Sequence, residues 1–188
     1  MISNGIIEMK EDIEDDNKII QVNFFDDIEQ DDIRKTKWLL DKYTDLIDVI
    51  KNYEYSLQQL ENGMAADVTA NAVLLKDQRH VNYKFYQFLT NNIKFAINNM
   101  RDKHEGLIVK LLFLDGMKYL KAQQYSEKGY RKDIPPISAT TFADKRRRAI
   151  VNIANSLKTN RTLDFVTIDY GRGRNQEGEI GLRMPEIN

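Results

Sequence analysis

The sequence contains no cysteine and only three prolines among its 188 residues. The absence of cysteine excludes disulfide bonds, thiol catalysis and thiolate metal sites. No apolar run approaches the roughly twenty residues that a membrane-spanning helix needs. The first residues also lack the basic and apolar segments of a signal peptide. We therefore expect a cytoplasmic protein that has no membrane partner.

Residues that carry catalysis are also scarce. His80 and His104 have no further histidines or carboxylates at metal-ligand spacing. Gly171 and Gly173 are followed by neither the lysine nor the helix of a phosphate-binding loop. No nucleophile stands beside a suitable base. We expect no enzyme activity, no catalytic residues, no metal and no cofactor.

The net charge of -1 hides a strong segregation of charge along the chain. Residues 1–32 hold eleven acidic and two basic residues, whereas residues 33–188 hold eighteen acidic and twenty-six basic ones. Such segregation is typical of an acidic tail beside a basic binding domain. Residues 1–30 are therefore interpreted as an acidic leader. It is either a solvated tail with a docking segment, or an intramolecular mimic of DNA phosphates, or a contact for a basic partner.

Two long helices are predicted after the leader. Apolar residues at steps of three and four predict one helix of about thirty residues over 31–61, which ends at Asn62 and Gly63. A second helix is expected over 72–100, and its aromatic residues favour core packing over base stacking. Residues 31–101 would then form a long antiparallel helical hairpin that serves as a scaffold. A homodimer formed through the helices of residues 31–100 is the alternative.

A helix-turn-helix region is expected over residues 102–160. The pattern predicts helices at about 104–115 and 117–126, separated by Gly116, then a loop over 127–136 and a further helix over 138–157. The loop is longer than the usual three- or four-residue turn. In residues 161–188, two alternating segments (162–170 and 179–184) flank a glycine-rich stretch and predict a small β-hairpin. The expected fold class is therefore mainly α.

The segment 138–157 carries the strongest functional signal. Its apolar residues recur at helical spacing and predict a buried stripe: Phe142, Ala149, Ile150, Ile153 and Leu157. Ser138 is expected to cap the helix. Four consecutive cations, Lys145, Arg146, Arg147 and Arg148, lie in its middle, with Arg146 nearest the apolar stripe. Thr140, Thr141, Lys145 and Arg148 fall on the other side, where hydroxyl and guanidinium groups suit the DNA major groove.

Two separated segments resemble the ArpU family. The opening run from Asp32 to Tyr43 combines charged residues and a threonine with a leucine pair and Lys-Tyr, and the closing helix begins Ile-Ser-Ala-Thr-Thr-Phe. The resemblance covers about residues 31–158 and implies a phage-encoded transcriptional regulator of packaging and lysis genes. It also implies a helix-turn-helix similar to region four of bacterial sigma factors. DNA contact would then involve Ala139, Thr140, Thr141, Lys145 and Arg148.

The sequence as a whole favours a sequence-specific, double-stranded DNA-binding transcriptional regulator in the host-cell cytoplasm. RNA polymerase is considered as a second partner, on which the sequence itself is silent. The candidate DNA-binding residues are Ser138, Ala139, Thr140, Thr141, Lys145, Arg146, Arg147 and Arg148, with Arg131 and Lys132 in the preceding loop. Two alternatives remain open: a DNA-binding packaging protein of the small-terminase type, and an interaction module with a DNA-mimicking leader.

Overall fold

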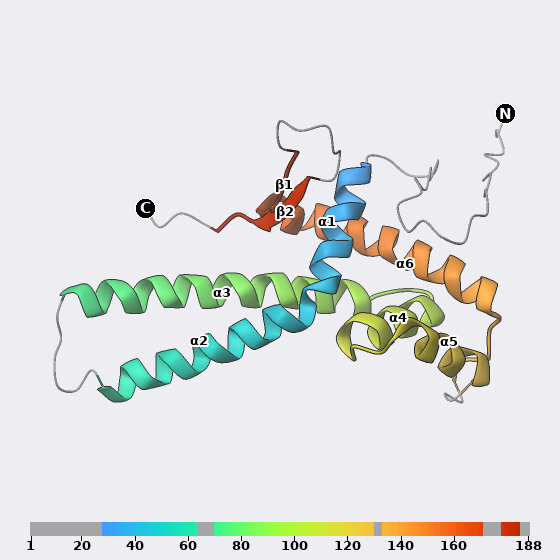
Figure 1. Cartoon of the computed structure of the whole chain (residues 1–188), viewed down its shortest axis with the longest axis horizontal. Helices are drawn as coiled ribbons and strands as arrows, with labels where there is room; N and C mark the ends of the chain where they lie inside the picture. The colour runs from blue at the N-terminus through green and yellow to red at the C-terminus, as the bar shows by residue number, and fades with distance from the viewer. Residues whose placement is uncertain (1–27, 64–69, 130–132, 171–177, 185–188) are drawn as a thin grey trace.

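The computed structural model describes residues 28–63, 70–129, 133–170 and 178–184 (Figure 1). These residues are mainly helical, and a small two-stranded sheet lies near the end of the chain. The expected fold class is confirmed. The predictions for the acidic leader before residue 28, and for Arg131 and Lys132, lie outside the described residues.

The first helical segment is broken, and the prediction of one continuous helix over 31–61 is wrong. α1 (Gln30–Asp41) ends at Lys42, and α2 (Tyr43–Gly63) leaves in a different direction (Figure 1). The two helices bury their apolar residues against different partners. α1 packs on α6 and β1, while α2 packs on the following helix. One straight helix cannot face both partners, so the axis changes between them.

α2 and α3 (Ala70–Asn98) form the expected antiparallel hairpin, which extends away from the rest of the molecule (Figure 1). The rings of Tyr53 and Tyr86 stack between the helices with centroids 5.9 Å apart. Asn82 donates a hydrogen bond of 3.2 Å to the Tyr53 hydroxyl. Core packing accounts for only part of the aromatic pattern, because Phe88 and Phe95 on α3 are exposed.

The predicted pair of helices after the hairpin is present, and the first of them ends in a π-helical turn. α4 (Lys103–Val109) continues into a π-helical turn, η1 (Lys110–Leu114). Gly116 then takes a φ of +62°, a left-handed conformation that glycine adopts at little cost. α5 (Tyr119–Lys128) and α6 (Ala139–Thr159) follow, close to the predicted bounds.

The predicted C-terminal β-hairpin is also present. β1 (Val166–Asp169) pairs antiparallel with β2 (Glu179–Leu182), and Val166 lies opposite Leu182. The first strand is shorter than predicted because residues 162–165 form a 3-10 turn, η2 (Thr162–Phe165). The buried hydroxyl of Thr162 in this turn accepts a hydrogen bond of 2.9 Å from Asn92 on α3.

α6 is the central element of the main hydrophobic core. Its buried residues pack with residues of α1, α2, α3, α4, η2 and β1 in one continuous cluster, so the predicted boundary near residue 101 does not separate two cores. A smaller cluster joins Phe142 of α6 to Ile108, Leu111 and Ala122. Both clusters hold α6 by one side only. Among the described residues, no helix is both long and apolar enough to cross a membrane.

Candidate nucleic-acid interface

The apolar stripe of α6 is buried as predicted. Five residues of this stripe have exposures of 3% or less: Phe142, Ala149, Ile150, Ile153 and Leu157. Ser138 caps the helix, and its hydroxyl accepts a hydrogen bond of 3.2 Å from the Thr141 amide. The sequence therefore fixes where α6 begins and which side faces the core.

The opposite side of the N-terminal half of α6 is open to solvent. Ser138, Ala139, Thr140, Arg147 and Arg148 are exposed, while Thr141 is half-buried. The Thr141 hydroxyl lies 2.9 Å from the Ser138 hydroxyl, so it belongs to the cap. Thr140 is thus the threonine whose side chain is presented outward at the start of the helix.

Lys145 is occupied within the protein. Its ammonium group donates a hydrogen bond to Asp102, the residue that caps α4, and its side chain is only 20% exposed. The expectation that Lys145 projects freely into solvent is therefore wrong. The helical periodicity of α6 does place Lys145 away from the apolar stripe, but α4 packs on that flank.

Arg146 lies over the aromatic ring of Tyr119, with the guanidinium carbon 5.4 Å from the ring centroid. This cation–π contact holds the side chain against the first turn of α5. Arg146 also lines an open cleft of about 200 Å³ between the α1–α2 junction and η1. Its predicted position near the apolar stripe is confirmed, because the side chain lies over packed residues.

Arg147 and Arg148 are the two exposed cations of the run. The side chain of Arg147 is 55% exposed, and its guanidinium lies 3.6 Å from the Asp144 carboxylate one turn earlier. Arg148 lies near Glu105, whose titration it influences. The four consecutive cations thus divide into two that contact side chains outside α6, Lys145 and Arg146, and two that face solvent.

A polar network on the α4 side of α6 explains the position of Lys145. Burial works to raise the pKa of Asp102. The hydrogen bonds from Lys145 and from two backbone amides outweigh burial and hold the pKa below its ordinary value. Burial raises the pKa of Glu105, which accepts a hydrogen bond of 2.8 Å from Asn152. These contacts fix the orientation of α4 against α6.

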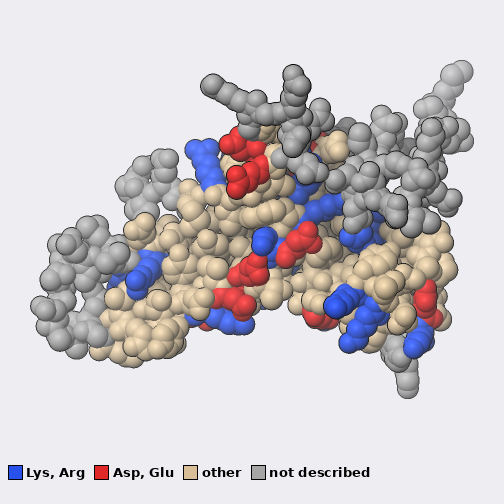
Figure 2. Space-filling view, in the orientation of Figure 1, with Lys and Arg blue, Asp and Glu red and all other residues tan. Residues whose placement is uncertain are grey.

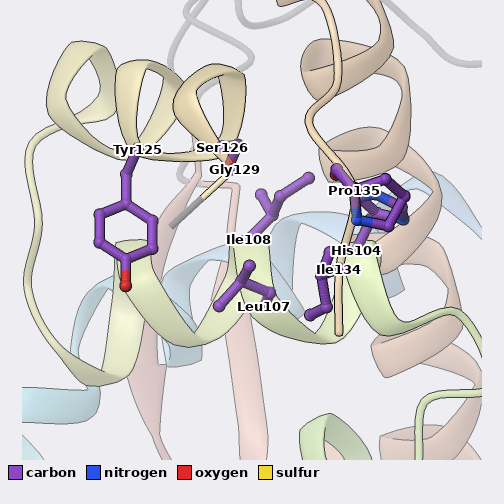
Figure 3. A pocket seen from close by; sticks show the side chains of 8 residues that line it. All are labelled: His104, Leu107, Ile108, Tyr125, Ser126, Gly129, Ile134 and Pro135. Carbon is purple, nitrogen blue, oxygen red and sulfur yellow. Dashed lines mark hydrogen bonds between the residues drawn. The ribbon is translucent and has the colours of Figure 1, made fainter. Parts of the chain in front are cut away.

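The loop between α5 and α6 is anchored on α4 despite its length. His104 lies 2.9 Å from the carbonyl oxygen of Pro135 (Figure 3). Gly129 has a φ of +63°, and a Cβ there would lie 3.1 Å from the Pro136 ring, so the close approach favours glycine. A cavity of only about 10 Å³ remains under the loop, room for no more than one water. The described part of the loop therefore holds α5 and α6 in a defined arrangement.

α4, η1 and α5 add further cations near the N-terminal end of α6. Figure 2 shows Lys and Arg side chains over this end of the molecule, where Figure 1 places α4 and α5. The exposed cations of these elements and their flanks are Lys103, Lys110, Lys118, Lys121 and Lys128. On α2 the single lysine, Lys51, is paired with Asp48 at 2.9 Å. The sequence interpretation included Lys128 in the basic region but missed the other four lysines, because they are scattered rather than consecutive.

The sequence interpretation also missed the role of Asp102 and Glu105. The order Asp-Lys-His-Glu is a helix-start signal, because an aspartate can cap the amides that follow it. That signal identifies the cap but not the lysine 43 positions later that pairs with it. Among the described residues, no three His, Asp or Glu side chains gather as metal ligands would.

No protein-family model, curated protein or solved structure matches this chain.

Proposed function

We propose that this protein binds double-stranded DNA by placing the N-terminal half of α6 in the major groove, and that it acts as a transcriptional regulator. The observation that carries the proposal is the division of α6 into two sides. One side is fully buried, and the other presents Thr140, Arg147 and Arg148 to solvent.

The dimensions of α6 suit this role. An α-helix with its side chains is about 10–12 Å wide, and the major groove is about 12 Å wide. The seven-residue step from Thr140 to Arg147 rises about 10 Å, which corresponds to roughly three base pairs. In helix-turn-helix proteins the N-terminal residues of the second helix contact base edges. Thr140 and Arg147 occupy this position on α6.

The remaining candidate residues divide by role. Ser138 and Ala139 lie at the exposed start of α6, where backbone amides can approach a phosphate. Lys145 and Arg146 position α6, because each is held by another side chain. Arg148 is exposed on the flank that faces α4 and suits a phosphate.

α5 supplies cations that suit the DNA backbone. The first helix of a helix-turn-helix crosses the phosphates beside the groove. Lys118, Lys121 and Lys128 are exposed at or along α5. Such contacts are independent of sequence and make binding strongly dependent on salt. The salt dependence of binding therefore measures phosphate contact by α5, whereas the preference for one base sequence measures groove contact by α6.

The role in transcription rests on the resemblance to the ArpU family. The segments that carry it form α1 and the start of α6. The family would make this chain a phage regulator of late genes, with RNA polymerase as a second partner. A packaging protein of the small-terminase type would also bind DNA, but as a ring and with little preference for sequence.

The test is a selection of duplexes from a random pool with the purified protein, followed by gel retardation. We expect enrichment of one motif and a preference for it over random DNA by at least about a thousandfold, the lower range for specific DNA-binding proteins. Arg147→Ala should remove the preference, whereas Arg161→Ala, at an exposed arginine beyond the end of α6, should retain it. Binding without enrichment, combined with a large oligomer in light scattering, would favour the packaging protein. The absence of any binding to DNA would refute both.

A further inference from the structure

An acidic side chain lies in the middle of the surface that is proposed to meet DNA. Asp144 follows Thr140 by one helical turn and precedes Arg147 by another, so it lies between them on the exposed side of α6. The Asp144 carboxylate lies 3.6 Å from the Arg147 guanidinium. The aspartate is 27% exposed and the arginine 55% exposed, so the arginine extends further into solvent.

If α6 contacted only phosphates, a carboxylate at this position would be unfavourable. It repels the DNA backbone and cancels one of the cations that would otherwise attract it. An exposed pair three residues apart also contributes little to the stability of a helix. Neither affinity for phosphate nor stability accounts for Asp144.

The recognition of bases does account for the presence of Asp144. An arginine recognises guanine by donating two hydrogen bonds to O6 and N7, which requires the planar guanidinium in one orientation. The Asp144 carboxylate attracts the guanidinium toward its own side of the helix. The Asp144–Arg147 pair at 3.6 Å is an ion pair that does not use a guanidinium N–H in a hydrogen bond to the carboxylate. A carboxylate can itself accept from the N4 amino group of cytosine.

We propose that Asp144 and Arg147 act together to select one G·C base pair. Arg147 contacts the guanine, and Asp144 is a positioning residue that holds the guanidinium toward the base edge. This inference rests on the proposed DNA binding by α6. It adds the base pair that is recognised and makes Asp144 a determinant of specificity.

The experiment measures dissociation constants for the selected duplex and for versions in which each G·C pair is exchanged for A·T. The proteins are the full chain, Asp144→Asn, Asp144→Glu and Arg147→Ala. Asp164→Asn is the control, since Asp164 is paired with Arg161, three residues before it, at 2.9 Å beyond the end of α6. Thermal unfolding verifies that every variant is folded.

For the full chain, exchange of one G·C pair should weaken binding by about tenfold or more. This discrimination should fall to about twofold or less in Asp144→Asn and Arg147→Ala, recover in part in Asp144→Glu, and persist in Asp164→Asn. A contrary result would be that Asp144→Asn binds both duplexes more tightly by the same factor and still discriminates between them. That result would overturn the inference and leave the proposed DNA binding intact. A selected motif without any important G·C pair would also overturn it. Failure of the full chain to bind any duplex would refute the proposed function itself.

Discussion

Lys145 of α6 donates a hydrogen bond to Asp102, the residue whose carboxylate caps α4. Asp102 Oδ1 accepts from the backbone amides of His104 and Glu105, while Oδ2 accepts from Lys145. One carboxylate thus joins the start of α4 to the middle of α6. Lys145 therefore contributes to the stability of the fold. Substitutions within the basic run should accordingly differ in how far they lower the free energy of unfolding.

Lys145→Ala should lower the free energy of unfolding by about 1 kcal/mol, because it removes a partly buried charged hydrogen bond. Arg148→Ala should change it by less than about 0.5 kcal/mol, since that side chain is exposed. Urea unfolding of both variants measures the difference. In a double-mutant cycle with Asp102→Ala, the effect of Lys145→Ala should shrink. Additive effects would show that the two side chains do not interact.

Glu105→Gln should change how stability depends on pH. Burial raises the pKa of Glu105, so the fold favours the protonated carboxyl. That contribution is complete below the ordinary pKa of glutamate and is lost as the pH rises through the raised value. The glutamine is neutral at every pH, and its carbonyl oxygen can still accept the hydrogen bond from Asn152. The variant should therefore gain stability relative to the natural chain as the pH rises.

Urea unfolding between about pH 3 and pH 8 tests this prediction. Asp102→Asn is the control, because it should change the dependence of stability on pH in the opposite direction. The pKa of Asp102 is held low, so its contribution is present above the ordinary pKa of aspartate and is lost as the pH falls through the lowered value. Parallel pH profiles for Glu105→Gln and the natural chain would contradict the account of Glu105.

Lys121→Ala should weaken binding to every duplex by a similar factor. The side chain is exposed on α5, where we place the phosphate contacts. Loss of one such contact should reduce the slope of log affinity against log salt by about 1. Lys51→Ala removes an exposed lysine from α2 and should leave the slope unchanged. A change of base preference in Lys121→Ala, with an unchanged slope, would contradict this assignment.

Deletion of residues 1–27 should tighten DNA binding at low salt. This segment carries eight acidic and two basic residues, so it opposes the basic surface of α5 and α6 in sign. The deletion retains Glu29, which caps α1 through a reciprocal pair of contacts with Asp32. Fluorescence anisotropy at several salt concentrations gives the affinities. Equal affinities of the full and shortened chains at low salt would end the idea that the leader competes with DNA.

Periodicity and capping signals predicted much of the fold because they act locally. The stripe from Phe142 to Leu157, the cap at Ser138 and the break at Gly116 follow from residues within a few positions. The break at Lys42 could not be predicted this way, because the apolar repeat continues through it. It depends on α1 and α2 packing against different helices.

The exposed side of the site could be predicted only in part. Helical spacing placed Thr140 and Arg148 away from the core, and the structure agrees. It could not identify Lys145 as paired with Asp102, because that contact depends on how α4 packs on α6. Spacing within one helix shows which side chains avoid its own apolar stripe, whereas neighbouring helices decide which of them reach solvent.

The chain has no cysteine, so a single introduced thiol can carry a DNA-cleaving reagent to one known position. Thr140→Cys places this probe at the exposed start of α6, and Thr159→Cys places it at the exposed far end of the same helix. With a selected duplex, we predict strand cleavage centred on the motif from position 140 and little or none from position 159. Equal cleavage from both positions, or cleavage only from position 159, would contradict insertion of the N-terminal half of α6 into DNA.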